Sequence, residues 1–268
     1  GYGLTTEDEI KSLKAIRELD KLHPVDLVPS FMGAHAVPEE YKDRPQEFID
    51  LIIEEMIPRV AEEKLAEFCD VFCEAKVFNV EESGRILECG KAHGLVPKVH
   101  ADEITPLGGA SLAAQVGAIT AEHLIHATDK GLEDMARSGV TAVLLPGTSL
   151  FLGAPFARAR KMIELGIPVA FATDFNPGSC PTESLQLIIN LACMKYKMTP
   201  EEVLTGVTLN AAAAINRAST VGTLEPGKYA DLVIWDAPDL DFIAYHFGVS
   251  LVDTVVKKGR AVVGSNLD

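Results

Sequence analysis

Six short apolar segments alternate with helical segments along most of the chain, and this alternation restricts the possible folds more than any other feature. The apolar segments end near residues 35, 74, 100, 123, 146 and 174. Between them, apolar residues recur at helical spacing, for example over residues 46–66. Such alternation is typical of a parallel sheet, because each helix returns the chain to the start of the next strand. The sequence therefore predicts an α/β fold with six βα units.

Two parallel architectures are compatible with this alternation. An open doubly wound sheet usually carries a G-x-G-x-x-G turn at its ligand site, and the sequence has none. A closed (β/α)8 TIM barrel instead gathers polar groups from many strand ends on one face. Because almost every apolar segment ends in a polar residue, we expect the barrel. Six strands cannot close it, so we also expect its first two strands to precede Gly1.

The pattern changes towards the C-terminus. Residues 222–235 read as a turn followed by a β-branched strand, and a second strand pair surrounds Lys258-Gly259. These strands lie outside the alternation. We therefore assign residues 1–215 to the barrel portion and its following helices, and residues 216–268 to the C-terminal part of a small accessory β-domain and a closing segment.

Charge and cysteine content exclude several classes of protein. The chain has 24 Lys and Arg against 39 Asp and Glu, a net charge of -15, and no basic cluster that nucleic acid or an anionic membrane would require. A small-molecule partner is the remaining expectation. Five cysteines without a Cys-x-x-Cys pair indicate neither disulfides nor a zinc knuckle, which fits a reducing cytoplasm.

Two strand ends carry groups that a metal could use. Asp174 ends the apolar run of residues 168–174, and a carboxylate there needs a cation or several hydrogen-bond donors to stay ionised. His100 ends a second short strand, in Lys-Val-His-Ala-Asp-Glu at residues 98–103. Imidazole nitrogen and carboxylate oxygen are ligands that zinc or iron(II) accepts. The competing interpretation of His100 alone is a core histidine bonded to a backbone carbonyl.

Short motifs at the strand ends resemble a known family. They include Gly-Tyr-Gly-Leu at 1–4, Gly-Ala-His-Ala-Val-Pro at 33–38, His-Ala-Asp-Glu at 100–103, Glu-His-Leu at 122–124 and Ala-Thr-Asp-Phe-Asn-Pro-Gly-Ser at 172–179. With these motifs the chain resembles the metal-dependent amidohydrolase superfamily and, within it, the imidazolonepropionase family, over essentially its whole length. The superfamily's first strand ends in a His-x-His pair that is absent here. We expect that pair, and the family's carboxylate-binding Arg, to precede Gly1.

The resemblance implies roles for individual residues. It makes His100 and Asp174 two ligands of one divalent ion, Zn or Fe, and Asp174 also a proton acceptor for the metal-bound water. It makes Glu103 a substrate-binding and proton-transfer group, and His123 the residue that orients or polarises the ring carbonyl. Without the resemblance, Glu103 would be interpreted as a solvated loop carboxylate.

Further residues are implied to bind the substrate. The substrate-binding residues are Tyr2, His35, Glu103, Asn176, Gly178 and Ser179. A phenol and an imidazole can bind a carboxylate or a ring carbonyl, and a turn can offer backbone N–H groups to an anion. Ordinary turn chemistry remains the alternative explanation for Gly178.

The implied activity is hydrolysis of the cyclic amide C–N bond of 4-imidazolone-5-propanoate by a metal-activated hydroxide, which gives N-formimidoyl-L-glutamate in histidine degradation. A cytoplasmic homodimer is expected. Two alternatives remain open at this point. One is another amidohydrolase-superfamily deaminase or cyclic amidohydrolase, and the other is an inactive, truncated chain that serves as a binding or structural module.

Overall fold

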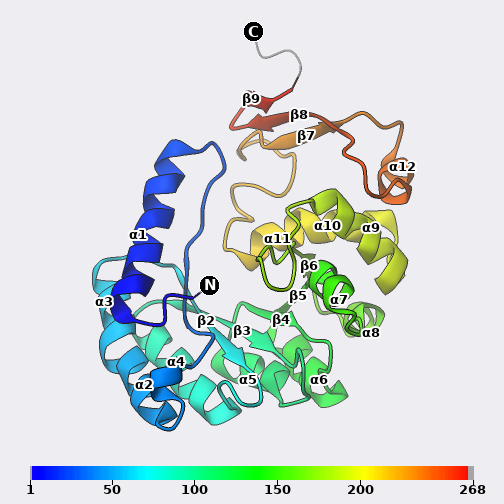
Figure 1. The fold of residues 1–268 in the computed structure, drawn as a ribbon. Helices are drawn as coiled ribbons and strands as arrows, with labels where there is room; N and C mark the ends of the chain where they lie inside the picture. Colours follow the sequence, from blue (N-terminus) through cyan, green and yellow to red (C-terminus); the bar gives the residue numbers. More distant parts are fainter. Residues whose placement is uncertain (1, 265–268) are drawn as a thin grey trace. The chain divides into compact units, whose positions relative to one another are not determined.

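The computed structural model of the chain describes residues 2–264 (Figure 1). Contacts between residues divide the chain into two compact units, Gly1–Val140 and Thr141–Asp268. None of the helices described in this range is long and apolar enough to cross a bilayer.

The first unit is built on four parallel strands that pair in chain order. They are β1 (Ser30–Ala34), β2 (Phe68–Cys73), β3 (Val96–Ala101) and β4 (Thr120–His123). The register pairs Cys73 with Ala101 and Ala101 with His123. The carboxyl ends of β2, β3 and β4 are therefore level, so residues that end these strands share one edge of the sheet.

Helices precede, connect and follow the strands of this unit. They are α1 (Thr6–Leu22), α2 (Pro45–Leu51), a π-helical segment (Ile52–Met56), α3 (Ile57–Glu62), α4 (Val80–Ala92), α5 (Gly109–Val116) and α6 (Asp129–Ser138), with a 3-10 turn at Glu39–Tyr41. Local sequence fixes several of the helix ends. Asn79 and Glu82 form a capping box at the start of α4, and Gly139, at φ 73°, ends α6 in the left-handed conformation that glycine adopts without strain.

The core of the first unit lies between the sheet and these helices. Phe31, Phe68 and Phe78 are almost completely buried, as are Phe48 and Met56. Burying each such side chain contributes about 1.5–3 kcal/mol. This packing fixes the strands, and with them the positions of the polar residues at their carboxyl ends.

The second unit begins with two parallel strands, β5 (Thr141–Leu144) and β6 (Val169–Phe171). Its helices are α7 (Pro146–Leu152), α8 (Ala159–Glu164), α9 (Leu185–Tyr196), α10 (Pro200–Val207), α11 (Leu209–Ala214) and α12 (Leu240–Tyr245). Pro146 was expected at a strand end, but it begins α7 because its fixed φ and missing N–H suit the first turn of a helix.

The predicted alternation is confirmed. Strands β1 to β6 end at residues 34, 73, 101, 123, 144 and 171, each within three residues of the predicted position.

A separate antiparallel sheet follows near the C-terminus. It contains β7 (Leu232–Trp235), β8 (Val252–Lys257) and β9 (Arg260–Val263). No residue of these three strands is buried, and Ile234 is 49% exposed. The strands lie outside the βα alternation, as expected. The division at residues 215 and 216, and the accessory domain itself, stay predictions.

Candidate functional site

Three histidines from different strand ends lie together in the first unit. His35 follows β1, His100 lies near the end of β3, and His123 ends β4. The ring centroids of His35 and His100 are 4.8 Å apart, and those of His100 and His123 are 5.3 Å apart. The parallel register thus brings together residues that are far apart in sequence.

A buried carboxylate on β2 completes this group. Asp70 Oδ1 is 2.9 Å from Nδ1 of His100 and 3.8 Å from Nε2 of His35. Donor atoms of these three residues lie within 4.8 Å of one another, a spacing that could hold a metal ion. We call His35, Asp70, His100 and His123 the strand-end cluster.

Asp70 begins the Asp-Val-Phe-Cys-Glu run at 70–74, but no role was predicted for it from the sequence. The available signal was an ionisable side chain between apolar neighbours inside a buried strand, where a charge is rarely found without a partner.

Burial sets the charge state of the cluster. Burial and the neighbouring His100 lower the pKa of His35 to about 3 and hold the pKa of His123 well below its usual value, so both rings are neutral at neutral pH. Burial alone would raise the pKa of Asp70, but the charge and hydrogen bond of His100, together with His35, hold it below its usual range. An ionised carboxylate beside the two neutral rings of His35 and His123 favours a cation.

His35 also shows that the cluster suits a ligand. Its side chain is buried, yet neither Nδ1 nor Nε2 has a hydrogen-bond partner among the described residues. Buried polar atoms without partners cost about 1–3 kcal/mol each, unless a ligand or ion satisfies them. The donor set, imidazole nitrogens and a carboxylate oxygen, is the set that zinc and iron(II) accept.

Glu103 lies beside the cluster. Its Oε2 atom is 3.5 Å from Nε2 of His123, and its side chain is largely buried. Two carboxylates anchor the loop on either side of it. Glu74 accepts the backbone N–H groups of Ile104 and Thr105, and Asp102 caps the start of α5. Glu103 is therefore held at the strand ends and is not a freely solvated loop residue.

Tyr2 lies on the outer side of His35. The two ring centroids are 5.2 Å apart, and Tyr2 is 46% exposed. The structure thus brings together Tyr2, His35, His100, Glu103 and His123, all of which were predicted to form one site.

The remaining predicted residues lie in the second unit, after β6. Asn176 Oδ1 accepts the backbone N–H groups of Gly178 and Ser179 at 2.9 and 2.8 Å. Its Nδ2 atom donates to the carbonyl of Asp174 and to Oγ of Ser179. We call residues 176–180 the Asn176 turn. The side chain of Asn176 already binds the backbone N–H groups of Gly178 and Ser179, which agrees with the alternative of ordinary turn chemistry given for Gly178.

Asp174 adopts a left-handed backbone conformation, with φ 56°, immediately before this turn. Thr148 on α7 donates a hydrogen bond to its carboxylate. Because His100 and Asp174 belong to different units, their pairing as metal ligands stays a prediction.

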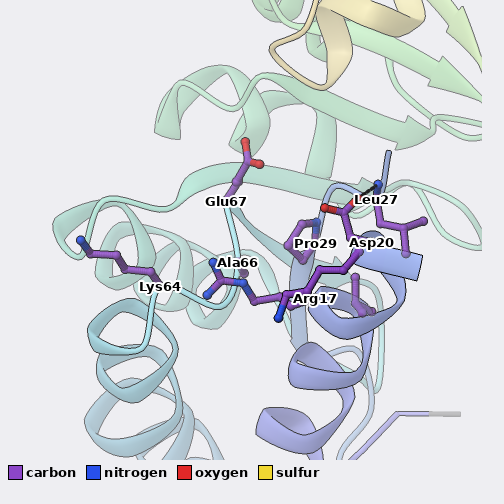
Figure 2. A pocket seen from close by; sticks show the side chains of 9 residues that line it. Arg17, Asp20, Leu27, Pro29, Lys64, Ala66 and Glu67 are labelled. Atoms are coloured by element: carbon purple, nitrogen blue, oxygen red, sulfur yellow. Dashed lines mark hydrogen bonds between the residues drawn. The ribbon is translucent and has the colours of Figure 1, made fainter. Parts of the chain in front are cut away.

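A cavity of about 260 Å³ is also present in the first unit (Figure 2). Its lining includes Arg17 from α1, Pro29 just before β1 and Glu67 just before β2. It therefore lies at the amino ends of these strands, opposite the strand-end cluster. Enzymes with parallel βα barrels place their chemistry at the carboxyl ends, so we do not assign the active site to this cavity.

The model of the amidohydrolase family matches residues 79–262, which is more than half of the chain. The chain belongs to the amidohydrolase family. The matched region contains the strand ends of β3, β4 and β6, from which His100, Glu103, His123 and Asp174 come.

Two similar curated proteins are both imidazolonepropionases. The imidazolonepropionase of Alkaliphilus oremlandii is 60% identical over 264 residues, which cover 98% of this chain and 63% of the relative. The imidazolonepropionase of Brevibacillus brevis is 59% identical, with 98% of this chain and 62% of the relative covered. The chain therefore spans slightly less than two thirds of the length of these relatives.

Solved structures show the fold. A 5-methylcytosine deaminase from Klebsiella pneumoniae has a TM-score of 0.77 at 18% identity, covering 98% of this amidohydrolase and 70% of the deaminase. A zinc-bound adenosine deaminase from Xanthomonas campestris has a TM-score of 0.71 at 19% identity. The match covers 94% of this chain and 64% of the deaminase chain. This likeness confirms the predicted fold class, the barrel type of metal-dependent hydrolases.

Proposed function

We propose that this chain carries the active-site strand ends of an imidazolonepropionase. The reaction is hydrolysis of the cyclic amide C–N bond of 4-imidazolone-5-propanoate to N-formimidoyl-L-glutamate, a step of histidine degradation. The observation that carries the proposal is the meeting of His35, His100, His123 and Glu103 at the carboxyl ends of parallel strands. Identity of 60% to a relative of that name, over 98% of the chain, supports the specific substrate.

One divalent ion, Zn or Fe, is part of the proposal. His100 and Asp174 would supply two of its ligands. The buried, cation-favouring character of the strand-end cluster supports such a site, and the adenosine deaminase neighbour has bound zinc. When bound, the ion lowers the pKa of a water molecule towards ~7 and so supplies hydroxide at neutral pH.

Different residues of the chain would then carry out the separate proton transfers of the reaction. Asp174 would accept the proton of the attacking water. Glu103, a carboxylate in a largely dry site, would hold a ring nitrogen of the substrate, take up that same proton and donate it to the leaving nitrogen as the C–N bond breaks. Neutral His123, within 3.5 Å of Glu103, orients the ring carbonyl for attack.

Substrate binding is assigned to two places. Tyr2 and His35 bind polar groups of the ring, since Tyr2 is exposed and His35 has unsatisfied nitrogens. Asn176, Gly178 and Ser179 bind the ring or the propionate. To do so, the Asn176 turn must exchange some of its internal hydrogen bonds for bonds to the ligand.

The test is a turnover assay on the protein as its gene encodes it. We expect loss of the imidazolone absorbance with formation of N-formimidoyl-L-glutamate by mass, at a kcat/KM on the order of 10⁴ M⁻¹s⁻¹ or higher. Release of ammonia from an aminated heterocycle, without ring opening, would instead indicate a deaminase. Metal binding without turnover of either substrate class would indicate an inactive binding or structural module.

Oligomeric state and location belong to the same proposal. We expect a homodimer in the cytoplasm, with no nucleic acid or membrane partner. The net charge of -15 supports the expectation that neither nucleic acid nor an anionic membrane is bound. Light scattering of the purified protein would give the oligomer mass, and a monomer mass at micromolar concentration would contradict the dimer.

A further inference from the structure

Asp70 and His100 share a hydrogen bond inside the sheet of the first unit. Asp70 Oδ1 lies 2.9 Å from Nδ1 of His100, and the exposed fractions of the two side chains are 5% and 16%. An ionised carboxylate can only accept hydrogen bonds, so Nδ1 of His100 must carry the hydrogen. When the His100 ring carries no charge, its lone pair is then on Nε2, the atom with which it would bind a metal.

We propose that Asp70 is the positioning residue for the metal ligand His100. It fixes the tautomer and the ring orientation that present Nε2, and its charge makes the imidazole a stronger ligand. This inference rests on the proposed function, in which His100 binds the metal. It adds a residue that acts through His100 and does not touch the substrate.

His35 and Lys98 also stabilise the charge of Asp70, but neither forms a hydrogen bond with it in the part of the chain that the structure describes. Lys98 is the nearby buried cation, but its ammonium group pairs with Glu122 at 3.1 Å. His35 is 3.8 Å from Asp70, beyond hydrogen-bond distance. Within residues 2–264, the bond to His100 is therefore the side-chain hydrogen bond that this buried carboxylate makes, and it gives Asp70 a defined orientation.

A different role is possible for the same atoms. His35, Asp70 and His100 could coordinate a metal directly, because their donor atoms lie within 4.8 Å of one another. That arrangement would require Nδ1 of His100 to lose its hydrogen and Asp70 to become a ligand. The two roles differ in the proton on Nδ1 and, where His100 also binds the proposed ion through Nε2, in the number of ions bound.

Metal affinity tests the proposal. Zinc binding is measured by chelator competition on the parent protein, Asp70→Asn and Asp70→Leu, with Glu122→Gln as a control that removes another buried strand carboxylate. We expect Asp70→Leu to bind zinc 10–100-fold more weakly than the parent, the usual cost of losing the hydrogen-bond partner of a metal ligand. The zinc affinity of Asp70→Asn should lie between those of Asp70→Leu and the parent. Glu122→Gln should stay within about threefold. Equal zinc affinity of Asp70→Asn and the parent would overturn the proposal. So would a parent protein that binds two zinc ions when Asp70→Leu binds only one.

The tautomer gives a readout that is independent of activity. In histidine-labelled protein, ¹⁵N NMR should find a proton on Nδ1 of His100, slow to exchange with water, both with and without zinc. In Asp70→Asn this proton should exchange faster. A parent that lacks it refutes the role of Asp70 even if the enzyme is active and Asp70→Leu fails to fold. If the proton and the affinity change are found but no ring opening occurs, the substrate proposal fails and the role of Asp70 stands.

Discussion

The strand-end cluster and the Asn176 turn hold their polar groups in opposite ways. In the cluster, each interaction joins residues from different strands, such as Asp70 and His100, and the groups are buried. In the Asn176 turn, the side-chain bonds join residues two or three positions apart, and Gly178 is exposed. The cluster therefore depends on the whole sheet, whereas the turn forms from its own sequence.

This difference has energetic consequences. Removing one member of a buried charged pair leaves the other uncompensated and costs about 3–5 kcal/mol. Removing a hydrogen bond in an accessible turn costs about 0.5–1.5 kcal/mol, because water replaces the lost partner. The strand-end cluster is therefore suited to a fixed catalytic geometry. The Asn176 turn is suited to exchanging its internal hydrogen bonds for hydrogen bonds to a ligand.

The largest effect is expected from His100→Ala. It removes a proposed metal ligand and leaves Asp70 without its hydrogen-bond donor. We expect loss of bound metal and a fall in kcat on the order of 10³ or more, within the range for acid–base and ligand groups. The control is His126→Ala, three residues past His123 and outside the cluster. Retained metal and turnover within a few-fold of the parent would remove His100 from the site.

A smaller effect is expected from Glu74→Gln, which weakens the anchor of the Glu103 loop. Burial raises the pKa of Glu74, but hydrogen bonds from Thr105, Ile104 and Ala75 outweigh it and lower the pKa overall. The charged carboxylate therefore stabilises the fold above its unfolded pKa of about 4.3, and this contribution is lost as pH falls through the lower folded pKa.

We accordingly expect Glu74→Gln to lower the free energy of unfolding by about 1–3 kcal/mol at pH 7. The difference from the parent should shrink as the pH falls below about 4.3. Urea denaturation at several pH values measures this. A difference that is constant from pH 7 to pH 3 would show that the charge of Glu74 does not hold the loop.

The smallest effect is expected in the Asn176 turn. Asn176→Ala removes the bonds to Gly178 and Ser179, but water can reach the freed groups. We expect a stability loss of about 1 kcal/mol and a rise in KM of about tenfold, with kcat nearly unchanged. Steady-state kinetics distinguishes this from the cluster variants. A fall in kcat as large as that of His100→Ala would mean that the turn belongs to the catalytic machinery.

The strands and their polar ends could be predicted because each signal is local. A short apolar run followed by a polar residue marks a strand end, as at His35, His100 and His123. The family resemblance added Tyr2 and Glu103, and these five residues do lie together. Asp70 could not be paired with His100 in this way, since its partner depends on the register between β2 and β3. The start of α7 at Pro146 was missed because the preceding apolar run resembled a longer strand.

For the Asn176 turn, the sequence left two uses of the backbone N–H groups open, binding of a ligand and ordinary turn chemistry. An Asn two or three residues before a backbone N–H is a frequent turn former, and here it occupies the groups that were expected to bind ligand. The pairing of His100 with Asp174 remains a prediction from the family resemblance.

The most direct test of the account is Glu103→Gln, because metal ligands are common to many amidohydrolases and Glu103 bears on the specific reaction. The variant keeps the shape of the side chain and removes its charge and proton transfer. Ring opening of 4-imidazolone-5-propanoate and bound metal are measured together, with Glu81→Gln on α4 as an exposed control. We predict retained metal, a normal fold and a rate lowered by a factor on the order of 10² or more. Retained metal with a rate within a few-fold of the parent would contradict the account.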